Sequence, residues 1–341
     1  MSKINIEGHS GLHREEYERI VFPRGNYAAV EIAGDYNVIV INAGSRFDGK
    51  FVVSGDYNKI TIHNDVNFNN GILIGADADA SVGVGNHIKC LGKTFITRDP
   101  NQYNDHTNYA LQINGHYTHW EGSGMNTKVV MQTVASKIAM ACVIGKKASD
   151  GASLDDSPTQ WCILEKTQFM VLYDGSNHGT SKYLLYVNGD AGSDIACGHL
   201  ITNNWFGSLG EYDASVNTGQ DTTAGGGGVI IDGATTRFVE NHVQPVYTGG
   251  TNLYLNGRRV ITLFNQLAHG SSFGADIHGD NNIFAGNLIY WNDGKSTSTK
   301  PINIGSGSDR SVIAGNRGGN TSSITDNSTN SSVGNNELGA L

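Results

Sequence analysis

The stretch GDYNVIVINAGSRFDGKFVVSGDYNKITIHN, residues 34–64, contains the tetrapeptide GDYN twice, at Gly34–Asn37 and Gly55–Asn58. Each copy leads into an alternating apolar run, first VIVIN and then KITIHN, that ends on asparagine. The copies begin at residues 34 and 55, so the repeat length is 21 residues. A repeat of this length with a strand in each unit indicates a solenoid, in which each repeat packs only on its neighbours.

The same period continues along the chain. We expect a third unit to begin at Gly75 and to lead into the strand ASVGVGN. Towards the C-terminus, the short runs RFVEN, VITLFN, IFAGN, VIAGN and SVGNN end on Asn241, Asn265, Asn287, Asn316 and Asn336. The leucine framework of leucine-rich repeats and the Trp-Asp signature of WD40 blades are both missing. The pattern therefore predicts an all-β fold, a right-handed parallel β-helix solenoid with three short strands per turn.

Asparagine recurs because each turn of such a coil must bend where the turn beneath it bends. Turns stack roughly 4.8 Å apart, so an asparagine at a bend can hydrogen-bond to the asparagine of the next turn. We expect Val38, Val40, Ile60 and Ile62 to point inward as stacked apolar columns. Cys142 and Cys162, about one period apart, are expected to be neighbours in such a column.

Composition agrees with many short strands joined by tight turns. The chain has 341 residues, with 45 glycines, 35 asparagines and only 5 prolines. The formal net charge of -9 argues against nucleic acid as the main partner. No apolar run reaches transmembrane length, and the N-terminus lacks a signal-peptide core, so we expect cytoplasmic synthesis without membrane insertion. The four cysteines contain no C-x-x-C pair and are expected to be buried free thiols.

The ends and the middle of the chain differ from the regular repeat. The segment SGLHREEYERI, residues 10–20, predicts a short amphipathic helix that caps the coil, with docking of a partner as the alternative. We therefore expect an N-terminal cap over residues 1–24 and one β-helix domain over residues 25–341. Irregular insertions are expected around residues 100–228, whose apolar runs are either further turns of the coil or hairpins beside it.

The GDYN repeats and the ending SDRSVIAGNRGGNTSSITDNSTNSSVGNNEL resemble right-handed parallel β-helix proteins of the pectate-lyase-like class. Within that class the chain is most similar to bacteriophage tailspikes and tail-fibre depolymerases, over residues 25–90 and 198–337. The resemblance implies a homotrimer, attached to other phage tail proteins, that binds and often cleaves bacterial surface polysaccharide.

The stretch of residues 199–228 is the richest in residues suited to carbohydrate. Sugar sites combine aromatic faces with carboxylates and amides, and glycoside hydrolysis uses a pair of carboxylates. We expect catalysis by Glu211 and Asp213, which would face one side of an extended segment. The other candidates here are the acids Asp221 and Asp232 and the binding residues Trp205 and Tyr212.

A lyase would use a different set of residues. β-Elimination needs a base and a cation that neutralises the substrate carboxylate. His242, Tyr247, Arg258 and Arg259 lie in adjacent predicted turns and could meet on one face.

The stretch HYTHWEG, residues 116–122, is dense in histidine and aromatic residues. Tyr117 and Trp120 are candidates for stacking on sugars. His116 and His119 would point to opposite faces of a strand, so we expect no metal site. No cofactor motif is present, and none is expected.

The expected function is that of a phage tailspike or tail-fibre protein that binds and depolymerises bacterial surface polysaccharide. Its expected location is the virion. Two alternatives stay open: a non-catalytic receptor-binding or structural tail protein, and a free bacterial polysaccharide lyase or epimerase.

Overall fold

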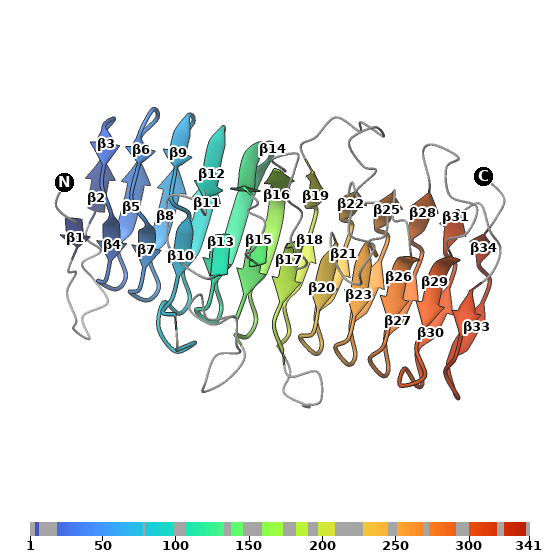
Figure 1. The fold of residues 1–341 in the computed structure, drawn as a ribbon. Coiled ribbons are helices and arrows are strands. Elements are labelled where there is room, and N and C mark those ends of the chain that lie inside the picture. Colours follow the sequence, from blue (N-terminus) through green and yellow to red (C-terminus); the bar gives the residue numbers. More distant parts are fainter. Residues whose placement is uncertain are drawn as a thin grey trace.

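The computed structural model describes residues 4–6, 19–77, 79–98, 107–132, 138–145, 159–172, 182–189, 197–208, 228–244, 251–268, 273–290, 300–318 and 324–338. These residues form β-strands and turns, and no helix occurs among them, so none that could cross a membrane is found there. Every strand pairing is parallel, and the strands stack side by side along the length of the molecule (Figure 1). The chain is thus all-β, with two long parallel sheets.

Sheet A contains every strand that begins a new rung of the stack. Its strands are β1 (Ile4–Ile6), β4 (Val30–Ile32), β7 (Phe51–Val53), β10 (Ile72–Ile74), β13 (Thr107–Ile113), β15 (Ile138–Ile144), β17 (Lys182–Val187), β20 (Val229–Ile231), β23 (Leu253–Leu255), β26 (Phe273–Ile277), β29 (Lys300–Ile304) and β32 (Thr325–Asp326).

Sheet B divides into two columns of paired strands, B1 and B2. Column B1 consists of β2 (Arg19–Phe22), β5 (Val38–Ile41), β8 (Lys59–Ile62), β11 (His87–Cys90), β14 (His119–Gln132), β16 (Ile163–Leu172), β18 (Leu200–Thr202), β21 (Arg237–Val239), β24 (Ile261–Leu263), β27 (Ile283–Ala285), β30 (Val312–Ala314) and β33 (Ser332–Gly334). Column B2 consists of β3 (Asn26–Tyr27), β6 (Arg46–Phe47), β9 (Val66–Phe68), β12 (Thr94–Arg98), the second halves of β14 and β16, β19 (Trp205–Ser208), β22 (His242–Gln244), β25 (Gln266–Ala268), β28 (Leu288–Tyr290), β31 (Arg317–Gly318) and β34 (Glu337–Leu338).

One rung is a strand of sheet A followed by one strand each of B1 and B2, and rungs are numbered 1 to 12 after the strands of sheet A. We call the turn from sheet A to B1 the first corner and the turn from B1 to B2 the second corner. Strands in the middle of the chain, such as β15, β16 and β17, pair with their neighbours in parallel like all the others. The described strands of the irregular middle are therefore further rungs, and none of them pairs as a hairpin.

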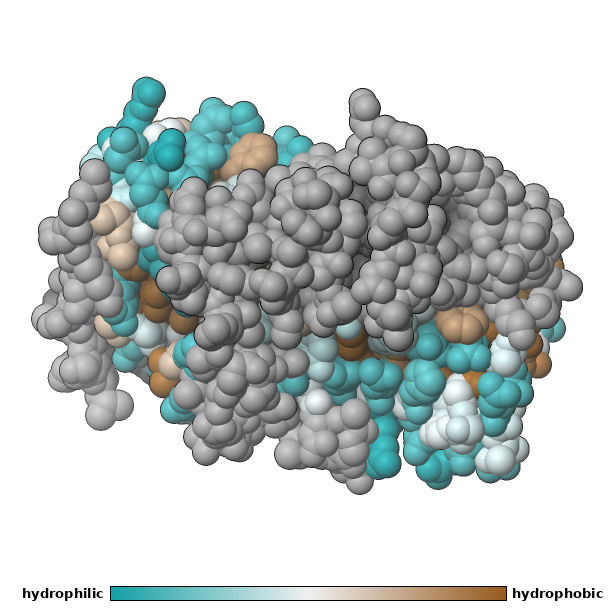
Figure 2. All heavy atoms as spheres, in the orientation of Figure 1, coloured by the Kyte–Doolittle hydropathy of each residue, from teal (hydrophilic) through white to brown (hydrophobic). Residues whose placement is uncertain are grey.

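The interior is apolar because alternate residues of each strand point inward. In column B1, Ile39 pairs with Ile60 and Ile41 pairs with Ile62, and all four side chains are buried. In column B2, the rings of Phe47 and Phe68 are stacked with centroids 4.8 Å apart. Full burial of each such side chain contributes about 1.5–3 kcal/mol. On the face drawn in Figure 2, hydrophilic residues cover most of the described surface and hydrophobic residues show only in small areas.

Several expectations about the interior need correction. Val38 and Val40 are half-exposed and face outward, because β5 is apolar on both of its faces and the register lies one residue from the expected one. Cys142 pairs with Leu111 and Leu185 in sheet A, whereas Cys162 lies at the first corner, so the two cysteines do not share a column. All four cysteines are buried free thiols, as expected.

The third repeat unit begins at Gly83 and not at the expected Gly75. The amide of Asn58 donates to Oδ1 of Asn86 (2.8 Å), and Val84 bonds to both Asp56 and Tyr57. Residues 83–86, GVGN, therefore occupy the place of a third GDYN. Residues 80–86 form bends and turns and not the expected strand. Most of the expected capping helix, residues 10–18, lies outside the described residues, and Arg19 and Ile20 belong to strand β2.

Candidate functional site

The second corner carries an unbroken ladder of asparagines in the C-terminal half of the chain. The backbone N–H of each asparagine donates to Oδ1 of the next, at 2.8–3.0 Å. Each side-chain amide also bonds to a backbone carbonyl of the rung before it. The members are Asn204, Asn241, Asn265, Asn287, Asn316 and Asn336. Five of these, from Asn241 onward, are the asparagines predicted from the sequence, and the predicted ladder is confirmed.

The residue before each ladder asparagine adopts the left-handed backbone conformation. Gly286 and Gly315 take it, with φ of 66°. Asn203, Glu240 and Phe264 take it in the three preceding rungs, with φ of 55–57°. This conformation costs an L-residue other than glycine roughly 1–2 kcal/mol, and asparagine tolerates it best. Glutamate and phenylalanine are therefore strained at these positions, as Tyr57, Trp161 and Arg259 are at the first corner, so the strain belongs to the corner geometry.

A second column of side chains runs beside these corner residues. Trp205 pairs with His242, and His242 with Gln266, at the start of successive B2 strands. The two columns border a groove of about 360 Å³ that crosses rungs 5 to 9. We call this site the corner groove. Its lining residues are Gly124, Met125, Thr167, Asn203, Asn204, Trp205, Glu240, Asn241, His242, Phe264 and Gln266.

Aromatic rings are held flat in the corner groove by glycines. A Cβ built on Gly207 would lie 2.1 Å from the Trp205 ring, and one built on Gly286 would lie 2.7 Å from the Phe264 ring. The rings of Trp205 and His242 are stacked at a centroid distance of 6.2 Å. Phe264 keeps 63% of its surface exposed although it is a large apolar side chain. The corner groove thus offers flat aromatic surfaces to a ligand.

Polar groups stand among these rings. Nδ1 of His242 lies 3.1 Å from Oε1 of Gln266, and its Nε2 lies 3.1 Å from Oε1 of Gln244. Glu240 and Asn203 are exposed on the corner itself. Glu240 is the single carboxylate in the described lining. Amide, imidazole and carboxylate groups beside aromatic faces can bind a ligand that has both hydroxyl groups and apolar C–H surfaces.

The structure places the predicted hydrolytic residues unevenly. Trp205 lines the corner groove. Asp232 lies at the first corner, where it accepts hydrogen bonds from the Tyr186 hydroxyl and from Nδ2 of Asn256 (2.9 Å). Burial and the neighbouring Asp232 carboxylate raise the pKa of Tyr186. Four further candidates lie outside the described residues: Glu211, Tyr212, Asp213 and Asp221.

The predicted lyase set is not brought together by the described residues. His242 lines the corner groove at the second corner, whereas Arg258 and Arg259 lie at the first corner. A B1 strand separates the two corners, and three residues of strand span about 10 Å. Nε of Arg258 instead faces Oδ2 of Asp280 at 3.9 Å. Tyr247 lies outside the described residues.

The two predicted aromatic residues of HYTHWEG have opposite environments. Tyr117 is 57% exposed at the first corner, in a left-handed conformation with φ of 57°. Trp120 is fully buried and donates from Nε1 to Oγ1 of Thr167 (3.0 Å). The prediction for Trp120 was wrong because the register of β14 turns its indole ring into the core, where no sugar can reach it.

The sequence analysis missed Glu240, Phe264, Asn203 and Gln266. Glu240 and Phe264 can be found by aligning the repeats on the asparagine at the end of each strand. The residue before the ladder asparagine is glycine or asparagine in most C-terminal rungs, but glutamate in FVEN and phenylalanine in LFN. A residue that departs from a conformational requirement marks a position to inspect.

No protein-family model matches this chain, and no curated protein matches it. What the corner groove binds is therefore inferred from its own side chains.

Proposed function

We propose that the chain is a right-handed parallel β-helix that binds bacterial surface polysaccharide in the corner groove, as part of a phage tailspike or tail fibre. The parallel pairing of every described strand and the asparagine ladder support the β-helix. The resemblance of the repeats to tailspike proteins supports the phage setting. The proposal includes a homotrimer attached to other tail proteins.

The observation that carries the proposal is the pairing of exposed aromatic rings with polar groups in three adjacent rungs. The rings of Trp205 and Phe264 offer surfaces for sugar C–H groups, while Glu240 and Gln266 offer acceptors for hydroxyls. These three rungs span roughly 10 Å along the stack, which is the length of a short oligosaccharide.

Depolymerisation is the proposed consequence of binding. Hydrolysis needs two carboxylates, roughly 5–9.5 Å apart depending on its stereochemical course. Glu240 supplies one, and the acids predicted from the sequence, Glu211, Asp213 and Asp221, are the candidates for the other. The lyase alternative has less support, because His242 has no arginine beside it in the described lining. A protein that only binds the glycan is the remaining alternative.

Incubation with a panel of capsular and O-antigen polysaccharides tests this function. Chain length, new reducing ends and unsaturated-uronate absorbance are followed together. We expect shortening with new reducing ends and no unsaturation, and we expect Glu240→Gln to slow it at least about tenfold. Unsaturated products would indicate a lyase. Binding without shortening would indicate a receptor-binding protein.

Light scattering on the same preparation tests the assembly. A trimer is expected for a tail protein. A monomer that still shortens polysaccharide would favour a free enzyme.

A further inference from the structure

A cluster of imidazole and carboxylate groups lies on the outer face of column B1, in rungs 4 to 6. His87 of β11 pairs with His119 of β14, so that their side chains stand one above the other. Glu121 and Glu165 stand in the adjacent outward column, two residues further along β14 and β16. His119 and Glu121 lie two residues apart on β14, whereas His87 and Glu165 are distant in the sequence and are brought to them by the register of the rungs.

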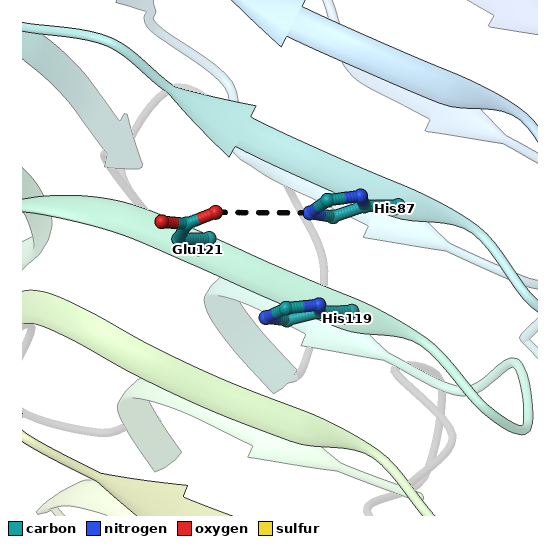
Figure 3. A group of neighbouring side chains, drawn as sticks. All are labelled: His87, His119 and Glu121. Atoms are coloured by element: carbon teal, nitrogen blue, oxygen red, sulfur yellow. Dashed lines mark ion pairs between the residues drawn. The ribbon is translucent and has the colours of Figure 1, made fainter.

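Figure 3 shows the two imidazole rings stacked, with the Glu121 carboxylate beside their nitrogen edges. The ring centroids are 4.5 Å apart and the rings are nearly parallel, at 6°. Nε2 of His87 lies 3.8 Å from Oε2 of Glu121, and Nε2 of His119 lies 2.8 Å from Oε1 of Glu165. The potential ligand atoms of His87, His119 and Glu121 all lie within 4.8 Å of one another.

The orientation of His87 has no explanation in hydrogen bonding. Its Nε2 atom is buried and has no hydrogen-bond partner, because the distance to Glu121 is too long for a hydrogen bond. A buried polar atom without a partner costs about 1–3 kcal/mol. Such an atom calls for a missing partner, such as an ion or a water molecule. Here it points toward a carboxylate and lies next to a second imidazole.

We propose that His87, His119 and Glu121 bind a divalent first-row transition metal ion, for which Zn²⁺ is the probe. Two imidazole nitrogens and one carboxylate oxygen form a three-ligand set that leaves a fourth position open. Imidazole with carboxylate suits Zn²⁺ and its neighbours better than Mg²⁺ or Ca²⁺. Glu165 Oε1 lies 2.8 Å from Nε2 of His119, so Glu165 acts as an outer carboxylate when His119 binds the metal through Nδ1, and a metal bound through Nε2 must displace Glu165.

Binding requires a small contraction of the cluster. Ligand atoms around a tetrahedral zinc ion lie about 3.3 Å apart, compared with 3.8 Å between His87 and Glu121 and with separations of up to 4.8 Å within the three residues. Rotation about the side-chain torsions of the three residues supplies this change, and the backbone register stays as it is. The proposal concerns a face of the stack other than the corner groove, so it stands independently of the polysaccharide function.

Two lysines compete with a metal for Glu121. Nζ of Lys89 lies 2.9 Å from Oε2 of Glu121, and Nζ of Lys166 lies 3.1 Å from Oε1. Both lysine side chains are about half-exposed and can turn into water. Because only 15% of the Glu121 side chain is exposed, these ion pairs are worth more than surface ion pairs, but the bonds of a metal ion to two imidazoles and a carboxylate outweigh one such pair. The metal is therefore expected to displace Lys89 from Oε2.

Titration of the full chain tests the site, after removal of any polyhistidine tag and of adventitious metal by a chelator. Calorimetry with Zn²⁺ is expected to show one equivalent bound at micromolar affinity or better, and Co²⁺ is expected to give a d–d absorption band of tetrahedral type. His87→Ala, His119→Ala and Glu121→Gln should each weaken binding roughly tenfold or more. Lys89→Met should strengthen binding severalfold, an effect that a purely structural role of the cluster would not produce.

His63→Ala is the matched control, because it removes a partly exposed histidine that lies outside both the cluster and the corner groove, and it should leave the affinity unchanged. The four cysteines are buried and do not compete for the ion. Thermal melting of each variant separates loss of binding from loss of folding, and Glu121→Gln preserves the shape of the side chain. The proposal is overturned if the native chain binds no Zn²⁺ at micromolar concentration, or if binding survives in the His87→Ala/His119→Ala double variant.

Discussion

The two corners of the stack are stabilised by different patterns of hydrogen bonds. At the first corner, the inward polar side chain bonds to the carbonyl three residues before it in its own turn, as in Asn37 to Gly34, Thr118 to Gly115 and Thr236 to Gly233. At the second corner, the asparagine amide bonds to the next asparagine and to a carbonyl of the rung before it. The first corner therefore has a bond within its own turn at these residues and adds bonds between rungs where the next turn offers an acceptor, as Asn58 and Asn86 do, whereas the second corner is bonded between rungs at every asparagine of the ladder.

This difference explains which residues each corner accepts. Local closure depends on one side chain at a time, so the first corner takes asparagine, threonine, cysteine, histidine and valine in successive rungs, for example Thr118, Cys162, His199, Thr236 and Val260. Closure between rungs depends on every neighbour, so the second corner keeps asparagine in six consecutive rungs. The stricter corner also carries the corner groove, whose position is thereby set by a continuous network.

Removal of one side chain from each corner should give the largest contrast. Asn265→Leu deprives the Asn241 amide and the Phe238 carbonyl of their partners, so we expect the free energy of unfolding to fall by at least about 3 kcal/mol. Thr236→Val removes a single local bond at the first corner and should cost about 1 kcal/mol. Urea denaturation of both variants measures the two losses. Equal losses would contradict the distinction between the corners.

The first corner should also make the stability of the chain depend on pH, through the buried His199. Burial lowers the pKa of His199 to about 3, and its Nδ1 accepts from the amide of Cys162 (3.1 Å). The unfolded chain, with an ordinary pKa near 6.5, then binds more protons than the folded chain between about pH 6.5 and 3. The stabilisation is complete above pH 6.5 and is lost as the pH falls toward 3, with about 2 kcal/mol lost at pH 5.

His199→Asn is the variant that isolates this effect. Asparagine accepts the same kind of backbone bond elsewhere at this corner, as Asn58 does from Asn37. Stability curves of native and variant chains between pH 7 and pH 4 should differ in slope, with the variant less sensitive to acid. Identical slopes would mean that His199 does not titrate with the proposed shift.

A smaller change in the free energy of unfolding is expected at Glu240, where the residue before the ladder asparagine is neither glycine nor asparagine. Glu240 holds a left-handed conformation that asparagine adopts more easily, as Asn203 does one rung earlier. Glu240→Asn should therefore raise the free energy of unfolding by roughly 0.5–1 kcal/mol while it weakens polysaccharide binding. Calorimetric melting together with a binding assay checks both parts. A loss of stability would show that Glu240 is retained for packing and not for a ligand.

The sequence predicts the stack and its asparagine ladder because both depend on short-range periodicity. It does not predict which face of VIVI points inward, since valine and isoleucine occupy both faces and the preceding turn decides the register. Trp205 and His242 can each be picked out in the sequence as single residues. Their contact depends on the pairing of two strands whose residues lie 37 positions apart. The cluster of His87 and Glu121 cannot be read from the sequence for the same reason. Its residues meet through a pairing between rungs, and an insertion makes that rung longer than the regular repeat.

The most direct test of the corner groove is a comparison of polysaccharide binding by two double variants, one at each corner. Trp205→Ala/Phe264→Ala removes the partly exposed ring of Trp205 and the exposed ring of Phe264 from the second corner, and Tyr57→Ala/Tyr117→Ala removes exposed rings from the first. Each stacked aromatic ring contributes on the order of 1 kcal/mol. We therefore expect Trp205→Ala/Phe264→Ala to lose tenfold or more in polysaccharide affinity and Tyr57→Ala/Tyr117→Ala to bind like the native chain. Unchanged binding by Trp205→Ala/Phe264→Ala, with loss in the first-corner variant, would contradict the assignment.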